Sequence, residues 1–252
     1  MLRLLGENDL ETVKRLTCNS LLGARIRGYA LCYGFDKSFI DFWAGDSVIV
    51  ARFENVFTVK ADESVCYEEL REFLDVIGAD DIVTDELTAM SLGFNDFDTK
   101  NGFVYVGDSF NSYDVKPLDD SFLPELYDVI SEAIPNSFSK DKNAYLSFLS
   151  DYMYRRSRGF SRAYGVCVSD KLVSTVITSS ETDESAIISG VACLERYRSF
   201  GYGKKTVLTL SSVLKNENKK VYVIALNESA EGFYKHIGFE PCCRIAYISK
   251  KV

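Results

Sequence analysis

The chain carries the stretch Arg198-Ser199-Phe200-Gly201-Tyr202-Gly203-Lys204-Lys205 between an alternating apolar segment and a helix-like run, Lys204 to Leu214. A phosphate group needs backbone N–H donors that it can approach closely, and Gly201 and Gly203 have no Cβ atom to obstruct that approach. The helix adds free amides and the positive end of its dipole, and Arg198 with Lys204 or Lys205 adds charge. The stretch predicts a strand, a glycine turn and a helix that hold a pyrophosphate. The alternative is an ordinary helix entry with a flexible start.

The segment downstream has an order and spacing that agree with this prediction. Residues 221–226 have the pattern of a buried strand, and residues 227–239 follow with a helical pattern. Asn227 or Ser229 is suited to capping that helix, and Gly238 is suited to ending it. The two segments together predict a second strand–helix unit directly after the first.

At this point the chain resembles the GNAT superfamily of acyl-CoA-dependent N-acyltransferases. The resemblance rests on Val191 to Tyr197 running into Arg198-x-x-Gly201-x-Gly203, and on Leu226-Asn227-x-x-Ala230-x-x-Phe233-Tyr234-x-x-x-Gly238-Phe239. It implies an α/β fold with a mixed, mostly antiparallel sheet flanked by helices. Read back to about Tyr113 it covers a whole domain. We expect strands at 113–118, 161–169, 171–180 and 185–194, helices at 123–133 and 143–155, and a tight Ser169-Asp170 turn.

The resemblance also implies a role for each motif residue. The strand end Val191, Ala192 and Cys193 would splay from its neighbour, and its main chain would hold pantetheine and polarise the thioester carbonyl. The residues expected to bind the pyrophosphate are Arg198, Ser199, Phe200, Gly201, Tyr202, Gly203 and Lys204. Asn227 matches a position that contacts the cofactor. Tyr234 matches the position that protonates the departing CoA thiolate as the general acid.

Each of these residues also has a simpler interpretation. Tyr234 could be a core aromatic on the helix face that carries Phe233, and Asn227 could serve only as the helix cap. Cys193 is interpreted as a small apolar strand residue and not a nucleophile, because nothing in the sequence places a base or a cation beside it. His236, the single histidine, is expected at the surface.

The sequence indicates less about the residues that bind and deprotonate the acyl acceptor. The attacking amine must lose a proton, which calls for a carboxylate or a water chain near the splayed strands. Glu181, Asp183 and Glu184 precede the strand that carries Val191, and Glu195 follows it. Acidic residues clustered in a hairpin loop are typical of solvated turns, so no base is assigned.

The first hundred residues repeat part of this pattern. Helical signals at 9–22 and 25–33 precede strand-like runs at 39–44, 47–53 and 56–60, and a helix at 68–77 and a strand at 81–84 follow. Residues 87–94 then end in a Gly-Phe pair before an alternating stretch to Val106. We predict a degenerate GNAT-like or accessory α/β domain at 1–107 and a catalytic domain at 112–252, in tandem. The alternative is an unrelated small domain.

The N-terminal copy has no counterpart of the glycine turn. Residues 60–67 contain no glycine and place Asp62 and Glu63 where a phosphate would lie, and nearby carboxylates repel a pyrophosphate. We therefore expect residues 1 to about 107 to shape the acceptor pocket or the wall between domains.

Composition excludes several classes of protein. The formal charge of −8 and the pI near 4.9 argue against a nucleic-acid or anionic-membrane surface, although Arg155, Arg156, Arg158 and Arg162 form a local basic patch. Without a run of eighteen apolar residues or a charged-then-apolar pattern at Met1, the protein is expected to be soluble and not exported. Seven cysteines without a Cys-x-x-Cys motif favour a reducing cytoplasm, and a single histidine argues against a metal site.

The sequence thus predicts an N-acetyltransferase that moves an acetyl group from acetyl-CoA to a primary amine by direct attack in a ternary complex. Two alternatives stay open. One is a non-catalytic module that binds acyl-CoA, and the other is an unrelated α/β binding protein with an accidental motif. The acceptor, the general base, the acyl chain and the oligomeric state are not predicted.

Overall fold

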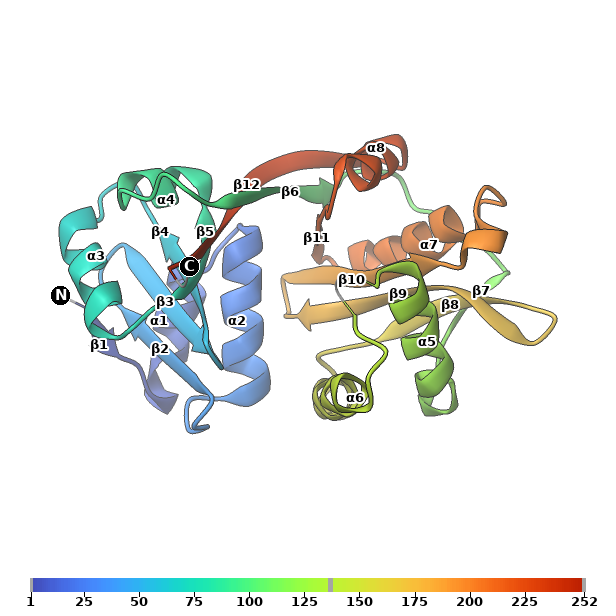
Figure 1. Ribbon diagram of the computed structural model, residues 1–252, viewed down its shortest axis with the longest axis horizontal. Coiled ribbons are helices and arrows are strands. Elements are labelled where there is room, and N and C mark those ends of the chain that lie inside the picture. Colours follow the sequence, from blue (N-terminus) through green and yellow to red (C-terminus); the bar gives the residue numbers. More distant parts are fainter. Residues whose placement is uncertain (1, 136–137, 251–252) are drawn as a thin grey trace. The chain divides into compact units, whose positions relative to one another are not determined.

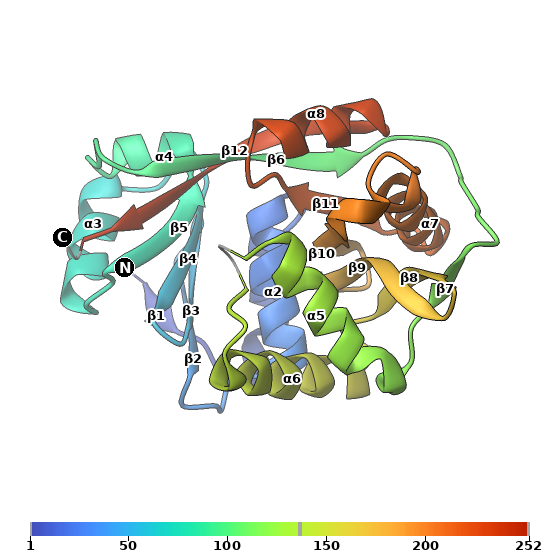
Figure 2. The same ribbon diagram turned by 45° about the vertical axis from the view of Figure 1, so that its right-hand side comes forward.

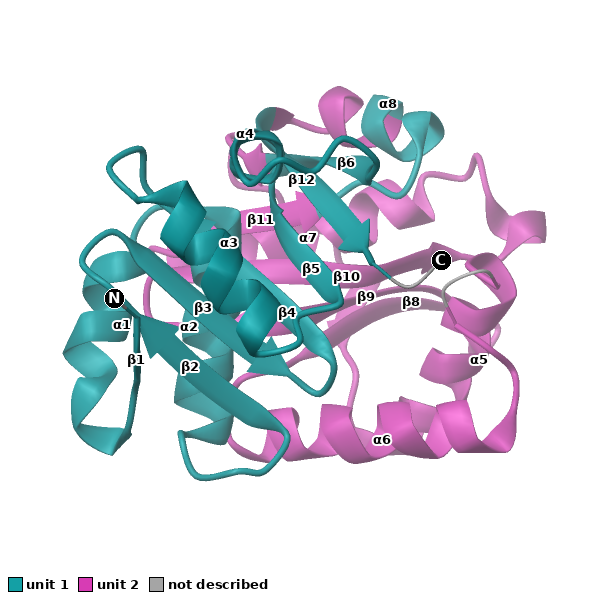
Figure 3. Cartoon of the chain, turned by 60° about the vertical axis from the view of Figure 1, so that its left-hand side comes forward, with its two compact units in different colours: residues 1–103, 224–232, 241–252 teal, residues 104–223, 233–240 magenta. Residues whose placement is uncertain are grey.

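The computed structural model describes residues 2–135 and 138–250. The chain divides into two compact units that do not follow the order of the sequence (Figure 3). Unit 1 comprises residues 1–103, 224–232 and 241–252, and unit 2 comprises residues 104–223 and 233–240. Strand β12, Phe239–Ser249, therefore begins in unit 2 and continues in unit 1.

The order of elements occurs twice along the chain, as β-α-α-β-β-β-α-β-α-β (Figure 1). The first copy comprises β1 (Arg3–Leu4), α1 (Leu10–Leu16), α2 (Leu21–Tyr33), β2 (Ile40–Ala44), β3 (Val48–Phe53), β4 (Val56–Ala61), α3 (Tyr67–Val76), β5 (Asp81–Asp85), α4 (Glu86–Ser91) and β6 (Asp98–Tyr105). The second copy comprises β7 (Val115–Pro117), α5 (Leu123–Ala133), α6 (Lys142–Ser157), β8 (Ala163–Val168), β9 (Lys171–Glu181), β10 (Ser185–Cys193), α7 (Tyr202–Asn216), β11 (Lys220–Ile224), α8 (Glu228–His236) and β12. Short 3-10 helices lie at Glu7–Asp9, Asp120–Phe122 and Glu195–Tyr197. The predicted mixed α/β fold is confirmed, and the two halves of the chain have the same order of elements.

The sheet of unit 1 has the strand order β1-β2-β3-β4-β5-β12. Its pairs are antiparallel except β4 with β5, which is parallel. The last strand of the chain lies beside β5, with Ile245 opposite Asp85 and Ser249 opposite Asp81. The sheet of the first unit is therefore completed by residues from the far end of the sequence.

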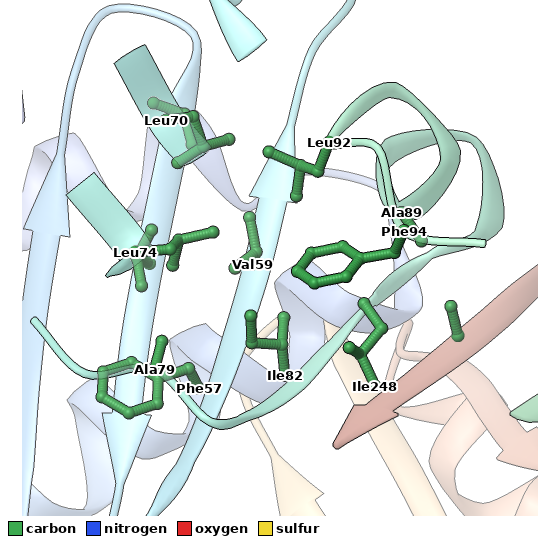
Figure 4. Close-up of a cluster of buried hydrophobic side chains, with 13 residues drawn as sticks. Phe57, Val59, Leu70, Leu74, Ala79, Ile82, Ala89, Leu92, Phe94 and Ile248 are labelled. Atoms are coloured by element: carbon green, nitrogen blue, oxygen red, sulfur yellow. The ribbon is translucent and has the colours of Figure 1, made fainter. Parts of the chain in front are cut away.

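The core of unit 1 lies between α3, α4 and this sheet (Figure 4). Leu70 and Leu74 stand four residues apart on α3, so they share one helix face and are buried together. They pack with Phe57 and Val59 of β4, and Ile248 of β12 belongs to the same cluster. Burial of these β12 side chains stabilises the pairing of β12 with the sheet of unit 1.

One predicted helix is shorter than expected. The helical signal at 9–22 predicts a helix through Leu22, but α1 ends at Leu16 and α2 begins only at Leu21. Asn19 has a φ of 55°, which breaks the helix, and the Ser20 hydroxyl accepts a 3.0 Å hydrogen bond from the Gly23 N–H. Ser20 is thus the N-cap of the second helix, a signal that the apolar pattern alone conceals.

Unit 2 contains the sheet order β11-β10-β9-β8-β7. Helices α5 and α6 pack on one face, where Ile130 and Tyr152 meet Ala192 and Leu194 of the β10 end. Helix α7 packs on the other face, where the Thr206 hydroxyl contacts the Ser174 hydroxyl of β9 at 3.2 Å (Figure 2). The β8–β9 turn is built on Ser169 and Asp170, with φ of 49° and 61°, the conformation that a two-residue hairpin of type I′ requires.

Candidate functional site

Strands β10 and β11 diverge along their length. Their parallel register joins Ser185, Ala186 and Ile187 to Lys220, Val221 and Tyr222. Beyond Ile187, β10 continues to Cys193 paired with β9 but not with β11. The divergence that the resemblance implies is therefore present. It leaves the main chain at the carboxyl end of β10 without a neighbouring strand on the β11 side.

A bulge lies at the divergent end of β10. The register with β9 shifts between Ser189 and Ala192, so that one extra residue is inserted near Gly190, which has a φ of 54°. A Cβ atom at this position would lie 2.9 Å from Cδ1 of Ile130 and 3.0 Å from Cγ1 of Ile177. Only glycine fits the bulge, because both the conformation and the packing exclude a side chain.

Two buried hydroxyls fix the carbonyl groups of this bulge. The Thr175 hydroxyl donates to the Gly190 carbonyl oxygen at 3.0 Å, and the Ser174 hydroxyl donates to the Ala192 carbonyl oxygen at 3.0 Å. Both hydroxyls come from β9 and both side chains are fully buried. The sequence predictions missed Ser174, Thr175 and Gly190, although a glycine inside a strand is itself a signal of a bulge.

The glycine turn follows at the end of the same strand. Ser199 and Gly201 have φ of 68° and 80°, and Gly201 is the residue before the first turn of α7. The first helical bond runs from the Lys205 N–H to the Gly201 carbonyl at 2.9 Å, so the N–H groups of Tyr202, Gly203 and Lys204 have no intrahelical acceptor. All three lie at the positive end of the helix dipole. The Gly203 N–H bonds the Cys193 thiol, which leaves the N–H groups of Tyr202 and Lys204 for an anion.

The two glycines of the turn are needed for different reasons. At Gly201 the positive φ favours glycine, while nothing lies within 4 Å of an added Cβ. At Gly203 an added Cβ would make only an ordinary 3.9 Å contact with Cys193. Packing inside the chain therefore does not demand glycine at 203, whereas close approach by a ligand would.

The basic residues of the turn are not equivalent. The Arg198 Nε donates to the Cys193 carbonyl oxygen at 3.3 Å, which connects the turn to the end of β10. Lys205 forms an ion pair with Asp114, whereas Lys204 is exposed. Arg198 and Lys204 are therefore better placed than Lys205 to meet an added anion.

Cys193 has the properties of a packing residue. Its thiol is half-buried, and burial raises its pKa above the ordinary value. The thiolate is the nucleophilic form of cysteine, and a raised pKa leaves little of it at neutral pH.

The two predicted residues around α8 lie in different units. Asn227 belongs to unit 1, where its Oδ1 accepts a 2.9 Å hydrogen bond from the Ala230 N–H, so it is the helix cap. Tyr234 belongs to unit 2 and is only 5% exposed, with its ring packed 5.5 Å from that of Phe239. Burial raises the pKa of Tyr234, so its phenol stays protonated at neutral pH but is a weaker acid than an exposed tyrosine. His236 is exposed, as predicted.

The acidic residues near β10 serve other purposes or lie elsewhere. Glu181 is 1% exposed and is held by Arg162 and Lys219, with Oε–N distances of 2.7 and 2.9 Å. Asp183 and Glu184 stand at the start of β10, about 20 Å or more from its other end at roughly 3.3 Å per residue. No carboxylate in this group is placed beside the bulge.

The predicted arginine patch is engaged within unit 2. Arg155 pairs with Asp151 at 2.8 Å, Arg156 with Asp120 at 2.8 Å, and Arg162 with both Glu181 and Glu217 at 2.7 Å. Arg158 lies over the Tyr154 ring at 3.9 Å. These arginines stabilise helix ends and strand edges, which favours the structural interpretation of the patch.

A cavity of about 1000 Å³ opens on the α5–α6 side of unit 2. Tyr127, Leu172 and Leu194 contribute buried side chains to it, and Asp128 and Glu132 lie at its exposed rim. Leu194 directly follows Cys193, so the cavity reaches the end of β10 on the face opposite α7.

The corresponding segment of the first copy differs from this arrangement. Between the described residues 55 and 77, no backbone φ is positive, and Asp62 forms a 2.9 Å ion pair with Lys60. The first copy therefore lacks the glycines of the turn, as predicted, and it also lacks the positive φ angles that the turn has in the second copy.

A model of the acetyltransferase (GNAT) family matches residues 123–239. The fold is similar to that of an acetyltransferase of the GNAT family from Colwellia psychrerythraea, with a TM-score of 0.65, 12% identity and 99% of each chain covered. A GCN5-related N-acetyltransferase from Kribbella flavida gives a TM-score of 0.63 at 10% identity, covering 91% of this chain and 94% of that one. A tandem GNAT protein from the clavulanic acid biosynthesis pathway gives 0.61 at 13% identity, covering 98% and 97%. No curated protein matches the chain.

Residues 123–239 thus match the acetyltransferase (GNAT) family, which indicates an acyltransferase, and the solved structures share the fold. Fold and family imply transfer of an acyl group from an acyl-CoA to an acceptor. Within the described part of the chain, no helix has the length and apolar character needed to cross a membrane.

Proposed function

We propose that the protein transfers an acetyl group from acetyl-CoA to a primary amine, by direct attack of the amine within a ternary complex. The observation that carries the proposal is the arrangement at the end of β10. There the divergence from β11, the bulge at Gly190 and the glycine turn after Arg198 lie on one continuous segment of unit 2.

The cofactor would be held almost entirely by main-chain groups. The N–H groups of Tyr202 and Lys204 at the start of α7 suit the pyrophosphate, and Arg198 and Lys204 add charge. The unpaired edge of Val191, Ala192 and Cys193 suits the amide-rich pantetheine arm. A backbone N–H aimed at the thioester oxygen would stabilise the oxyanion that forms during attack.

The chemical step then needs few side chains. The amine nitrogen forms a bond to the thioester carbon and loses a proton to water, while the carbonyl electrons move to oxygen. Collapse of this intermediate re-forms the carbonyl and breaks the carbon–sulfur bond. Tyr234 would donate a hydrogen bond or a proton to the departing thiolate, since its phenol is protonated at neutral pH. Asn227 would contact the cofactor in addition to capping α8.

The acceptor would approach β10 from the α5–α6 face. The cavity that ends at Leu194 supports this route, and the carboxylates of Asp128 and Glu132 at its rim favour a cationic amine. The seven cysteines, all free thiols, support a reducing compartment such as the cytoplasm.

The experiment compares the wild-type protein with Tyr234→Phe in a screen of primary amines, with release of the CoA thiol as the readout. An enzyme should lose kcat by about 10²-fold or more when a general acid is removed, while its affinity for acetyl-CoA stays the same. Binding of acetyl-CoA without turnover in either protein would instead indicate a non-catalytic acyl-CoA-binding module.

A further inference from the structure

Two neighbouring thiols in unit 1 are in contact with each other. The sulfur atoms of Cys242 and Cys243 on β12 lie 3.7 Å apart, within the distance of an S–H···S hydrogen bond. Successive side chains of a regular strand point to opposite faces, so this contact marks a local departure from strand geometry. The regular ladder of β12 with β5 begins only at Ile245.

Glycine on the neighbouring strand β6 makes room for the inner thiol. A Cβ atom at Gly102 would lie 2.6 Å from the sulfur of Cys243 and 2.9 Å from Cδ1 of Leu21. The Cys243 sulfur therefore fills the space that a side chain at position 102 would need. Cys243 is half-buried as a result, while Cys242 remains exposed.

The contact shifts the pKa values of the two thiols in opposite directions. A hydrogen bond from Cys243 lowers the pKa of Cys242, and the same bond, burial and the charge of Asp85 raise the pKa of Cys243. The thiolate therefore forms on the exposed sulfur, and the proton stays on the sulfur beside it. By contrast, burial raises the pKa of both Cys167 and Cys193.

We propose that Cys242 and Cys243 form a site of reversible oxidation by hydroperoxides. The Cys242 thiolate attacks the peroxide oxygen, which gives a sulfenic acid on Cys242 and releases an alcohol or water after protonation. The Cys243 thiol then attacks the Cys242 sulfur, a sulfur–sulfur bond forms, and water leaves. An accessible thiolate poised next to a resolving thiol is the arrangement that redox-sensing cysteines use.

The product should be easy to reduce. Neighbouring Cα atoms across a trans peptide bond are about 3.8 Å apart, below the roughly 4.4–6.8 Å of ordinary disulfides. A vicinal disulfide is therefore strained, and strained disulfides have more oxidising potentials and react readily with dithiols. Peroxide would thus form the disulfide, and a mild reductant would return both cysteines to thiols.

The test uses the full-length protein treated with hydrogen peroxide, then with iodoacetamide, and digested with trypsin. Cleavage after Lys235 and Arg244 gives one fragment that holds both cysteines and no others. We expect this fragment to lose two hydrogens, to carry no alkyl group, and to regain two alkylation sites after dithiothreitol. Cys18 and Cys66, exposed single cysteines, are internal controls that should form no such intramolecular product.

Two variants separate the steps. Cys243→Ser should stop at a sulfenic acid on Cys242 that dimedone traps, and Cys242→Ser should leave Cys243 unoxidised at the same peroxide concentration. The proposal is overturned if the fragment stays fully alkylated after peroxide, if it is oxidised irreversibly, or if either cysteine becomes linked to a second chain.

Discussion

The hydroxyl of Thr175 donates a 3.0 Å hydrogen bond to the carbonyl oxygen of Gly190, at the bulge of β10. The bond joins β9 and β10 in the part of β10 that is no longer paired with β11. A buried hydroxyl that holds a carbonyl in this way sets the orientation of the neighbouring N–H groups. Those groups are the ones that the proposed mechanism uses.

Replacing Thr175 with Val should therefore reduce turnover more than cofactor affinity. The variant leaves the buried Gly190 carbonyl without its donor, which costs about 1–3 kcal/mol of the free energy of unfolding. We expect kcat to fall because the oxyanion donors lose their orientation. Ser179→Ala is the matched control, since Ser179 bonds the Ile187 carbonyl at 3.2 Å, at a separate register shift that precedes the Gly190 bulge. Equal losses of kcat in both variants would contradict the role of Thr175.

Substitution of Cys193 should preserve the reaction. Burial raises the pKa of this thiol, so a covalent acetyl-cysteine intermediate is not expected. The Cys193→Ala variant should keep most of the wild-type turnover, and mass spectrometry of the wild-type protein incubated with acetyl-CoA alone should show no acetylated Cys193. An acetyl group on Cys193 that an added amine removes would contradict direct attack.

Tyr234 should make stability fall at high pH. Burial raises its pKa above the ordinary value near 10, so the folded state keeps a proton that the unfolded state has lost. The unfolded state then binds fewer protons, and the free energy of unfolding decreases as pH rises above about 10. Tyr234→Phe should flatten this decrease in urea titrations between pH 9 and 11. A decrease of the same slope in both proteins would show that the phenol is not buried in solution.

Loss of the buried charge at Glu181 should destabilise the protein. Arg162 and Lys219 both pair with its carboxylate. Removing one member of a buried ion pair costs up to about 3–5 kcal/mol, and the cost is smaller here because both cations also pair with Glu217. Glu181→Gln should lower the free energy of unfolding measured by urea titration. Glu195→Gln, at an exposed position, should change that free energy by less than about 0.5 kcal/mol. If Glu181→Gln abolished turnover without loss of stability, Glu181 would have to be reconsidered as a base.

Local signals in the sequence predicted the local structure well. Helix α5 occupies residues 123–133 as expected, because its apolar spacing is regular and Pro124 stands in its first turn. The Ser169-Asp170 turn was also predicted correctly, since a two-residue hairpin depends on those residues alone. The boundary between α1 and α2 was missed because the Ser20 cap lies inside a continuous apolar pattern.

Features that depend on distant contacts could not be predicted in this way. The pairing of β12 with β5 joins residues about 160 positions apart, as Ile245 opposite Asp85 shows, and no local pattern encodes it. The same holds for the hydroxyls of Ser174 and Thr175, which become part of the site only because β9 lies beside β10. The residues of the glycine turn could be proposed from the sequence because glycine and charge mark them directly.

The most direct test of the central claim is a calorimetric titration of acetyl-CoA into the wild-type protein and into a Gly201→Glu, Gly203→Glu variant. Gly159→Glu is the matched control, because Gly159 also has a φ near 80° and open space around it in unit 2. We predict saturable binding to the wild-type and control proteins and none to the folded double variant, whose carboxylates would occupy and repel the phosphate position. Equal binding to all three proteins, or no binding to the wild-type protein, would contradict the proposed cofactor site.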